Sequence, residues 1–496
     1  EINIKFSEVA DTSTSLVKSN YNISPEFGQP LVVSLHEDDS RIVRLLYGTS
    51  FNENIEYTLT INNIADRCGN SMNDTSLTFI NYPAKVFDVL ITEIMPEPAP
   101  VVYLPDAEYL ELYNKSDYTI NTSGWTLKQG NTDCELPAAE IPSGGYLALT
   151  DEDDIHLFPD SLNIAGVNSL PSLPNTTGEL KLYSKNGKII HFVNYSSEWH
   201  GSPSKEEGGW SLEMIDTENP CGENDNWKSS TSSTGGTPGR ENSVKNENPD
   251  LYIPELSNAI ITIPDTLIIY FNESIHPGFE ASTNKFTVNN SIGNPIYIEK
   301  KHNNQKALKL VFSTSFESDI VYTLTIADSV KDCAGNLISE NVSIDFAIPD
   351  TVEEMDLVIN EVLFNPRDGG SDFVELYNKS DKIINLADLR MATRDDDMII
   401  DDLNEITEIG FLLFPGDFAV ISENINNIEN EYYCKYPDQL IQTENLPSYS
   451  NSQGDVILCK PNQEIIDEVV YNEEMHFSLL RSVKGVSLER IDYNKG

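Results

Sequence analysis

Two glutamates within apolar sequence are the residues of this chain whose surroundings most suggest chemistry. Glu93 lies in VLITEI at 89–94, and Glu111 lies in YLELY at 109–113. A carboxylate between such neighbours is costly to bury without a partner. On adjacent strands, the two carboxylates could share a proton or hold a cation. In the structural alternative, each accepts hydrogen bonds from a loop backbone or pairs with a lysine such as Lys115.

The same pair occurs a second time. Glu361 lies in LVINEV and Glu375 lies in FVELY, with Lys379 in the place of Lys115. A feature of the fold would recur in both copies of a repeat, so we favour the structural interpretation. Acid–base cleavage of a sugar would also need a cleft, which no sequence feature indicates.

Two acidic runs are candidate calcium-binding loops, and calcium is the only cofactor that the sequence suggests. The carboxylates concerned are Asp151, Asp153 and Asp154 in one run and Asp395, Asp396 and Asp397 in the other. Calcium prefers a shell of several oxygen ligands. Neither run has the DxDxDG spacing of an EF-hand loop, so we favour solvated acidic loops.

Other chemical motifs are scarce. The seven histidines are scattered without an HExxH motif, and neither GxSxG nor GxxxxGK[ST] is present. His200 and His476 occupy equivalent places in the two halves, but each stands alone, which favours a structural role. The sequence therefore predicts no catalytic residues and no enzyme.

The glutamates belong to strands that the chain uses twice. The string ELYNKSD occurs at 111–117 and at 375–381, and each copy closes an alternating run typical of a half-buried strand. The likeness continues to WSLEMID at 210–216 and VSLERID at 486–492. A second repeat is marked by YTLTI, followed by DRCGN or DCAGN and preceded by NIKFSE or IIYFNE. Two domain types therefore alternate, with a period of roughly 265 residues.

We predict an all-β chain of four tandem β-sandwich domains, because short runs rich in Val, Ile, Thr, Tyr and Phe alternate with turn residues. Only 423–433 suggests a short helix. The segment 231–250, rich in Ser, Gly and Asn, is interpreted as a flexible linker. The predicted domains are 1–84, 85–240, 241–350 (linker included) and 351–496.

The chain is strongly acidic, with 80 acidic and 32 basic residues and a formal charge of -48. This charge argues against nucleic acid and anionic membranes as partners. No apolar run is long enough to insert into a membrane. Cys134 with Cys221, and Cys434 with Cys459, could form disulfides or remain buried thiols. Neither end completes its repeat, so we expect a longer parent chain that holds any signal peptide and anchor.

The second and fourth domains resemble bacterial lamin-tail domains, an immunoglobulin-like sandwich family. The resemblance rests on ITEIMPEP or INEVLFNP, the ELYNKSD string, SGWTL, IPSGGYLALT and GGTPG. The fourth domain departs from it, with Leu389 in the place of Trp125. The first and third domains resemble bacterial Ig-like domains of surface-layer and other exported proteins. DSL- and DTL-type triplets resemble O-glycosylation sites of Bacteroidota.

The resemblance implies a fold rather than an activity. We expect a non-catalytic extracellular or cell-surface scaffold or adhesion protein of a Bacteroidota-like bacterium. Its partners would be other surface or outer-membrane proteins, or extracellular glycans. Two alternatives remain open: an accessory region of a larger secreted hydrolase or nuclease, and a subunit of an outer-membrane assembly.

Overall fold

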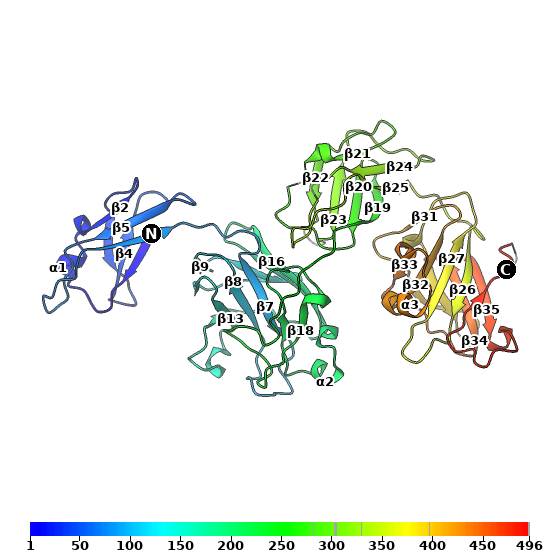
Figure 1. The fold of residues 1–496 in the computed structure, drawn as a ribbon, viewed down its shortest axis with the longest axis horizontal. Coiled ribbons are helices and arrows are strands. Elements are labelled where there is room, and N and C mark those ends of the chain that lie inside the picture. Colours follow the sequence, from blue (N-terminus) through cyan, green and yellow to red (C-terminus); the bar gives the residue numbers. More distant parts are fainter. Residues whose placement is uncertain (281, 302–304, 329, 396, 495–496) are drawn as a thin grey trace. The chain divides into compact units, whose positions relative to one another are not determined.

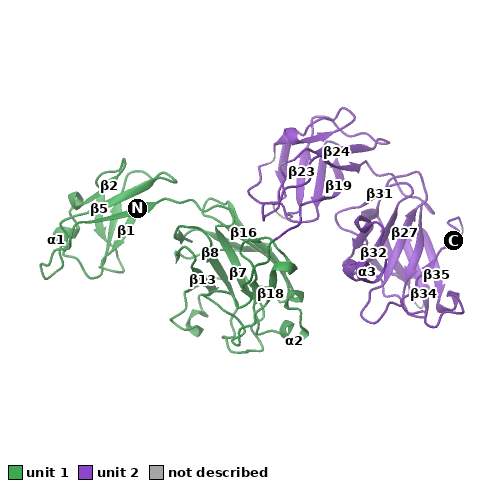
Figure 2. Cartoon of the chain, in the orientation of Figure 1, with its two compact units in different colours: residues 1–249 green, residues 250–496 purple. Residues whose placement is uncertain are grey.

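The computed structural model describes residues 1–280, 282–301, 305–328, 330–395 and 397–494. Within these residues the chain consists almost entirely of short strands (Figure 1). The longest described α-helix, α3, spans Ile425–Glu431, inside the stretch where a short helix was predicted. The all-β prediction is therefore confirmed. The chain forms two compact units, residues 1–249 and 250–496 (Figure 2), and each unit holds a smaller and a larger sandwich.

The first small domain packs two three-stranded sheets, with orders β1-β4-β3 and β2-β5-β6. Its core contains Tyr21, Leu45, Tyr57 and Leu59. In β5, Tyr57, Leu59 and Ile61 are buried and alternate with more exposed residues, as a strand with one face on the core requires. The strands are β1 (Ile2–Lys5), β2 (Tyr21–Ser24), β3 (Val32–Leu35), β4 (Ile42–Leu46), β5 (Glu56–Ile61) and β6 (Thr75–Ile80).

The second small domain repeats this arrangement with one additional strand. Its sheets have the orders β19-β20-β23-β22 and β21-β24-β25, around a core that includes Leu267, Ile269, Tyr322 and Phe346. The strands are β19 (Leu256–Ile263), β20 (Thr266–Phe271), β21 (Phe286–Val288), β22 (Tyr297–Lys300), β23 (Ala307–Val311), β24 (Tyr322–Ile326) and β25 (Val342–Phe346).

The first large domain has a six-stranded sheet, β14-β13-β8-β7-β17-β18, and a four-stranded sheet, β11-β10-β15-β16. A two-stranded ribbon of β9 (Ile120–Asn121) and β12 (Glu140–Ile141) lies beside them. The main strands are β7 (Val89–Met95), β8 (Tyr109–Asn114), β10 (Thr126–Gln129), β11 (Thr132–Glu135), β13 (Tyr146–Asp151), β14 (Ile164–Val167), β15 (Thr177–Tyr183), β16 (Ile189–Ser196), β17 (Leu212–Met214) and β18 (Trp227–Ser229).

The second large domain has a five-stranded sheet, β33-β32-β27-β26-β36, and a four-stranded sheet, β30-β29-β34-β35. Over its described residues it therefore has the sheets of the first large domain as far as the equivalent of β17. The ribbon pairs β28 (Ile384–Asn385) with β31 (Leu412–Leu413). The main strands are β26 (Leu357–Leu363), β27 (Phe373–Asn378), β29 (Arg390–Arg394), β30 (Ile400–Glu405), β32 (Phe418–Ser422), β33 (Leu440–Gln442), β34 (Gln453–Cys459), β35 (Ile465–Asn472) and β36 (Leu488–Glu489).

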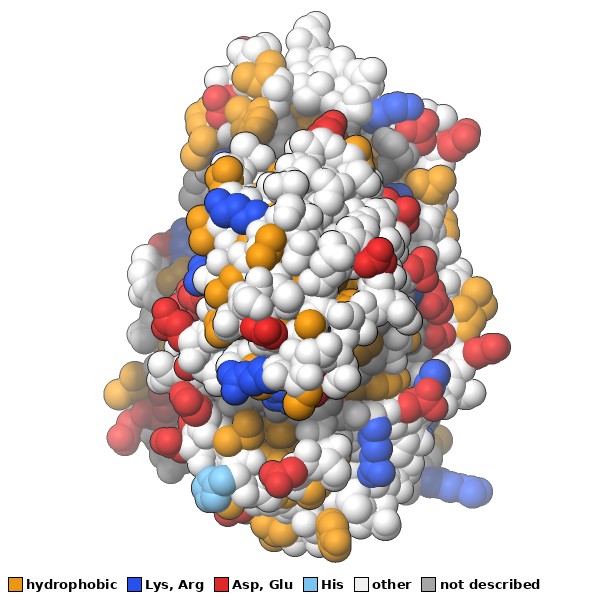
Figure 3. All heavy atoms as spheres, turned by 90° about the vertical axis from the view of Figure 1, so that its left-hand side faces the viewer, with side chains coloured by type: hydrophobic (Ala, Val, Ile, Leu, Met, Phe, Trp, Pro, Cys, Tyr) orange, Lys and Arg blue, Asp and Glu red, His pale blue; other side chains and the backbone are white. Residues whose placement is uncertain are grey.

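Cys134, Cys434 and Cys459 are free thiols, so neither of the two pairings that the sequence left open forms. Cys434 packs in a cluster with Phe373, whereas Cys459, on β34, packs in a separate cluster. The two sulfurs therefore lie in different apolar clusters of the domain. Acidic and basic side chains are interspersed over the face that Figure 3 presents. No helix in the described part of the chain has the length and apolar character needed to cross a bilayer.

Candidate functional site

Glu93 and Glu111 lie side by side in the six-stranded sheet. β7 pairs with β8 so that Glu93 stands opposite Glu111, and β17 places Glu213 opposite Glu93 on the other side. We call these three residues the glutamate row, and all three are fully buried. Sequence reasoning found the first two. It missed Glu213, which lies in the repeated WSLEMID motif, because only the strand pairing puts it beside Glu93.

A β-bulge at Thr92 orients this row. The pairing of β7 with β8 shifts register between Ile91 and Glu93, which leaves Thr92 as the additional residue. The Thr92 hydroxyl donates to Glu111 Oε1 at 2.8 Å. The backbone N–H of Ile91 donates to His191 Nδ1 at 3.0 Å, so the proton of this imidazole is on Nε2, which faces the Pro220 carbonyl at 2.9 Å. Burial lowers the pKa of His191 to about 4.

The residues that follow β18 cover the glutamate row, and we call residues 231–248 the strap. Three backbone N–H groups of the strap each donate to a different glutamate: Thr237 to Glu93 Oε1 (2.7 Å), Arg240 to Glu111 Oε2 (3.1 Å) and Val244 to Glu213 Oε2 (3.1 Å). The row is therefore the surface on which the strap is fixed to the sheet.

Side chains complete the acceptor shell of the row. Glu93 Oε1 also accepts from the Tyr109 hydroxyl and the Ser211 hydroxyl, both at 2.6 Å. Glu213 Oε2 also accepts from the Ser243 hydroxyl at 2.8 Å. Hydrogen bonds of this kind offset much of the cost of burying a carboxyl group. Lys115, the predicted alternative partner, donates elsewhere, to the Thr217 carbonyl and Glu218.

The interpretation of 231–250 as a flexible linker is wrong for the strap. Asn242 Nδ2 donates to the carbonyls of Thr92 (2.8 Å) and Met214 (2.9 Å), which ties the strap to two strands. Gly236 is required by close approach, since a Cβ there would lie 2.2 Å from Tyr109 Oη and 2.7 Å from Glu93 Oε1. The close contact between the strap and the sheet requires small and polar residues, which are the same residue types that suggested a flexible linker.

Burial favours the protonated forms of Glu93 and Glu111. Burial raises the pKa of Glu93 to about 7, with the neighbouring Glu213 charge adding to the effect. Burial also raises the pKa of Glu111 well above its usual range, with Glu93 adding. The Thr237 hydroxyl faces two carboxyl groups, donating to Glu213 Oε1 at 2.9 Å and lying 3.3 Å from Glu93 Oε2. This buried network joins the strap to the sheet.

The second large domain repeats the row, and none of its described residues, which reach 494, corresponds to the strap. Glu361 stands opposite Glu375 on one side and Glu489 on the other, and Asn360 forms the equivalent bulge. Glu361 and Glu375 are half-buried, and Glu489 is exposed. The Ser487 hydroxyl donates to Glu361, and Asn360 Nδ2 donates to Glu375 Oε1 at 2.6 Å. Burial raises the pKa of Glu361 and of Glu375.

The position equivalent to His191 is occupied by Asp467 in this second copy. The backbone N–H of Ile359 donates to Asp467 Oδ2 at 2.7 Å, and Arg490 pairs with the same oxygen at 2.5 Å. Both side chains of this ion pair are almost completely buried. The N–H group beside the bulge therefore has a side-chain acceptor in both domains, supplied by two different residue types.

Comparison with known proteins fits this architecture. A lamin tail domain model matches residues 83–197 and 352–473, and a bacterial Ig-like domain model matches residues 252–347. The chain carries two lamin tail domains and a bacterial Ig-like domain. The first lamin tail match includes Glu93 and Glu111 but ends before Glu213 and the strap. No curated protein matches the chain.

Two solved structures are similar to the chain at low identity. One is the S-layer protein rSbsC(31-844), with 10% identity and a TM-score of 0.19, covering 84% of this chain and 61% of that one. The other is the native conformation of E. coli alpha-2-macroglobulin, with 9% identity and a TM-score of 0.14, covering 95% of this chain and 41% of that one. The chain thus spans less than two thirds of either.

The predicted calcium loops are turns in which aspartates bond their own backbone. Asp151 accepts from the N–H of Asp153 at 3.0 Å, and Asp154 lies beside them in the same half-buried to exposed loop. Asp395 accepts from the N–H groups of Asp397 (3.0 Å) and Ile399 (2.8 Å). Asp396 lies outside the described residues.

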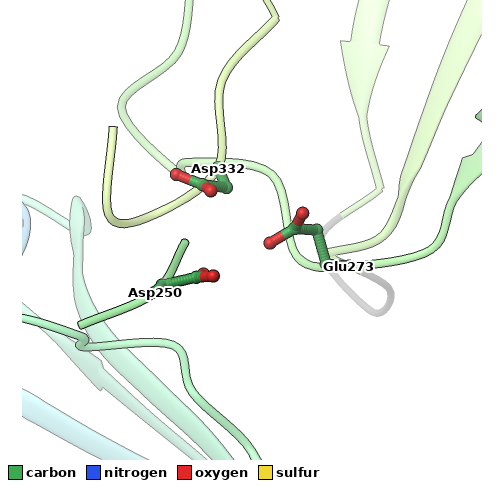
Figure 4. A group of neighbouring side chains, drawn as sticks. All are labelled: Asp250, Glu273 and Asp332. Carbon is green, nitrogen blue, oxygen red and sulfur yellow. The ribbon is translucent and has the colours of Figure 1, made fainter. Parts of the chain in front are cut away.

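Three other carboxylates come together in the bacterial Ig-like domain and the segment before it. Oxygens of Asp250, Glu273 and Asp332 lie within 4.8 Å of one another, and Figure 4 shows the three side chains gathered at one place. Burial raises the pKa of Glu273 to about 7, with Asp250 and Asp332 adding. Carboxylates at this spacing offer oxygen ligands to a divalent cation. The signal was present in the repeated motifs, because Glu8 and Asp66 are the equivalents in the first small domain.

Proposed function

We propose that this chain is a non-catalytic scaffold or adhesion protein, exported to the bacterial cell surface, where it displays or joins other parts. The observation that carries the proposal is the bonding of the glutamate row. The carboxylates whose sequence context most suggested acid–base chemistry are buried, and their oxygens accept hydrogen bonds from the strap. A general acid or base must instead reach the proton that it transfers.

Three further features support the same function. The chain is a series of β-sandwich modules that include two lamin tail domains and a bacterial Ig-like domain. Its net charge of -48 favours solubility outside the cell and disfavours nucleic acid. Sandwich modules bind partners on edge strands and loops, so other surface or outer-membrane proteins and extracellular glycans are the proposed partners.

Gentle detergent extraction of the native protein, followed by quantitative mass spectrometry of what accompanies it, tests this proposal. We expect the protein on the cell surface, where protease added to intact cells removes it, and without a catalytic domain in its parent chain. A stoichiometric outer-membrane partner would make it a fixed assembly subunit instead. A catalytic domain in the same polypeptide would make these modules an accessory region of a hydrolase or nuclease.

A further inference from the structure

We propose that the first lamin tail domain binds a neutral oligosaccharide in a cleft on the outer face of its four-stranded sheet. The cleft has a volume of about 840 Å³ and is formed mainly by β15, β16 and the turns that follow β16 and precede β18. The inference makes the proposed function more specific and rests on it for the source of the ligand, since extracellular glycans are among the proposed partners.

Four side chains of two paired strands form the floor of the cleft. β15 pairs with β16 so that Thr177 stands opposite Ser196 and Glu179 stands opposite Asn194. Residues two apart in a strand share a face, so these side chains project from one side of the sheet. Lys181, which is almost completely buried, donates to Glu179 Oε1 at 2.5 Å and holds that carboxylate in place. The floor therefore presents hydroxyl, amide and carboxylate groups from a fixed backbone.

The amide side chains of the cleft are not bonded within the fold. Gln129, Asn194 and Asn224 line the cleft, and none of these side chains has a hydrogen-bond partner among the described residues. An amide group both donates and accepts hydrogen bonds, as a sugar hydroxyl does. None of the described residues that line the cleft is Lys, Arg or His, so nothing there pairs with a phosphate, sulfate or carboxylate. A neutral ligand rich in hydroxyl groups fits this lining.

An indole ring forms one wall of the cleft. Trp199 packs on the buried Trp227, with ring centroids 6.0 Å apart and ring planes inclined by 32°, and it also lines the cleft. A sugar ring carries hydroxyl groups around its edge and C–H groups on its faces, and such C–H groups pack on aromatic rings. A polar floor beside one aromatic wall therefore matches the two kinds of surface that a saccharide presents.

The second lamin tail domain indicates which residues of this cleft the fold itself requires. Tyr195 stands opposite a glycine in β15, and Tyr471 stands opposite a glycine in β34, so this pair recurs in both domains. Asn194 corresponds at the same register to Val470, which is 65% exposed. The strand therefore accepts an apolar side chain at this position, and the asparagine of the first domain is not required for folding.

An array of neutral and acidic oligosaccharides, probed with the purified full chain, tests the proposal, and calorimetric titration then measures the affinity for each oligosaccharide that binds. We expect binding to a neutral oligosaccharide, and about tenfold weaker binding by Asn194→Val, which loses the amide but keeps a side chain that the strand accepts. Asn168→Val makes the same change at an exposed position outside the cleft and should bind as wild type does. Absence of binding to every neutral oligosaccharide on the array, or equal affinity of Asn194→Val and wild type, would overturn the proposal.

Salt dependence distinguishes this ligand from a cationic peptide, which the carboxylates of the cleft would attract instead. Binding of a neutral oligosaccharide should change little between about 0.1 M and about 1 M salt, because no charge is paired. Binding of hexalysine that is weakened by salt and that displaces the oligosaccharide would assign the cleft to a cationic peptide and overturn the proposal.

Protease treatment of intact cells tests the proposed function separately from this site. A chain that binds the oligosaccharide but is protected from the protease would support the site and contradict the proposed surface location. A chain that the protease removes but that binds no neutral oligosaccharide would overturn the site and leave the proposed function standing.

Discussion

The backbone N–H of Thr237 donates to Glu93 Oε1 at 2.7 Å, across 144 residues of chain, and its hydroxyl lies between Glu93 and Glu213. This one residue therefore joins the start and the end of the first lamin tail domain. Burial raises the pKa of Glu93 to about 7, so this carboxyl binds a proton more readily than an exposed glutamate does. We therefore make separate predictions for removing the Glu93 side chain and for replacing only its ionisable group.

We expect Glu93→Ala to destabilise the first lamin tail domain by about 3 kcal/mol, because the Tyr109 and Ser211 hydroxyls and the Thr237 N–H lose a buried acceptor. Glu93→Gln should cost far less, since the amide oxygen keeps these bonds and the amide nitrogen donates where the carboxyl proton was. Denaturation followed by tryptophan fluorescence measures this domain, which holds all four tryptophans. Equal losses in both variants would show that Glu93 is ionised.

The dependence of stability on pH follows from the same group. Burial raises the pKa of Glu93 to about 7, above its usual 4.5, so the folded domain binds this proton more tightly than the unfolded chain. Its contribution is present at low pH and is lost as the pH rises through about 7, by about 3 kcal/mol in full.

His191 acts in the opposite direction in an overlapping range. Its pKa is lowered to about 4, so its contribution is lost as the pH falls below 6.5. The informative quantity is therefore the difference between wild type and Glu93→Gln at each pH. We expect Glu93→Gln to gain relative stability between pH 5 and pH 8, in about the range where Glu93 titrates. A difference that does not change with pH would contradict the protonated row.

Gly236→Ala is expected to release the strap, because the new Cβ would lie 2.2 Å from Tyr109 Oη. Trypsin cleavage after Arg240 and Lys245, within the strap, measures the release and should become faster. Tyr109→Phe removes the clashing oxygen, so the double variant should recover part of the protection. If Gly236→Ala alone resists trypsin as wild type does, the strap is not held by close packing at this glycine.

The sequence was sufficient to predict the β-sandwich architecture and two of the three glutamates in each row. Alternation in YLELY and FVELY places Glu111 and Glu375 on strands, and the duplication identifies Glu93 with Glu361. These are local or repeated patterns, which is why they can be found without a structure.

The strap and Glu213 could not be predicted, for physical reasons. The strap is held largely by backbone N–H groups, which every residue but proline has, and its partners are up to 150 residues away. Its Ser, Gly and Asn content matches that of a linker. Glu213 joins the row only through the pairing of β17 with β7. His191 accepts a hydrogen bond from the Ile91 N–H, beside a bulge that no sequence motif indicates.

The carboxylate cluster of the bacterial Ig-like domain gives the last prediction. Glu273 Oε1 is buried and has no hydrogen-bond partner among the described residues, and burial with Asp250 and Asp332 nearby raises the Glu273 pKa to about 7. The cost of its charge is therefore present above pH 7 and vanishes as the pH falls. In a metal chelator at pH 8, Glu273→Gln should slow hydrogen exchange in β20, modestly because Glu273 is partly exposed to solvent. Glu8→Gln, at the exposed equivalent position, is the matched control and should leave exchange in β1 unchanged.

If calcium slows exchange in wild type but not in Glu273→Gln, the cluster holds the cation. If neither calcium nor Glu273→Gln slows exchange, the three carboxylates do not strain this domain.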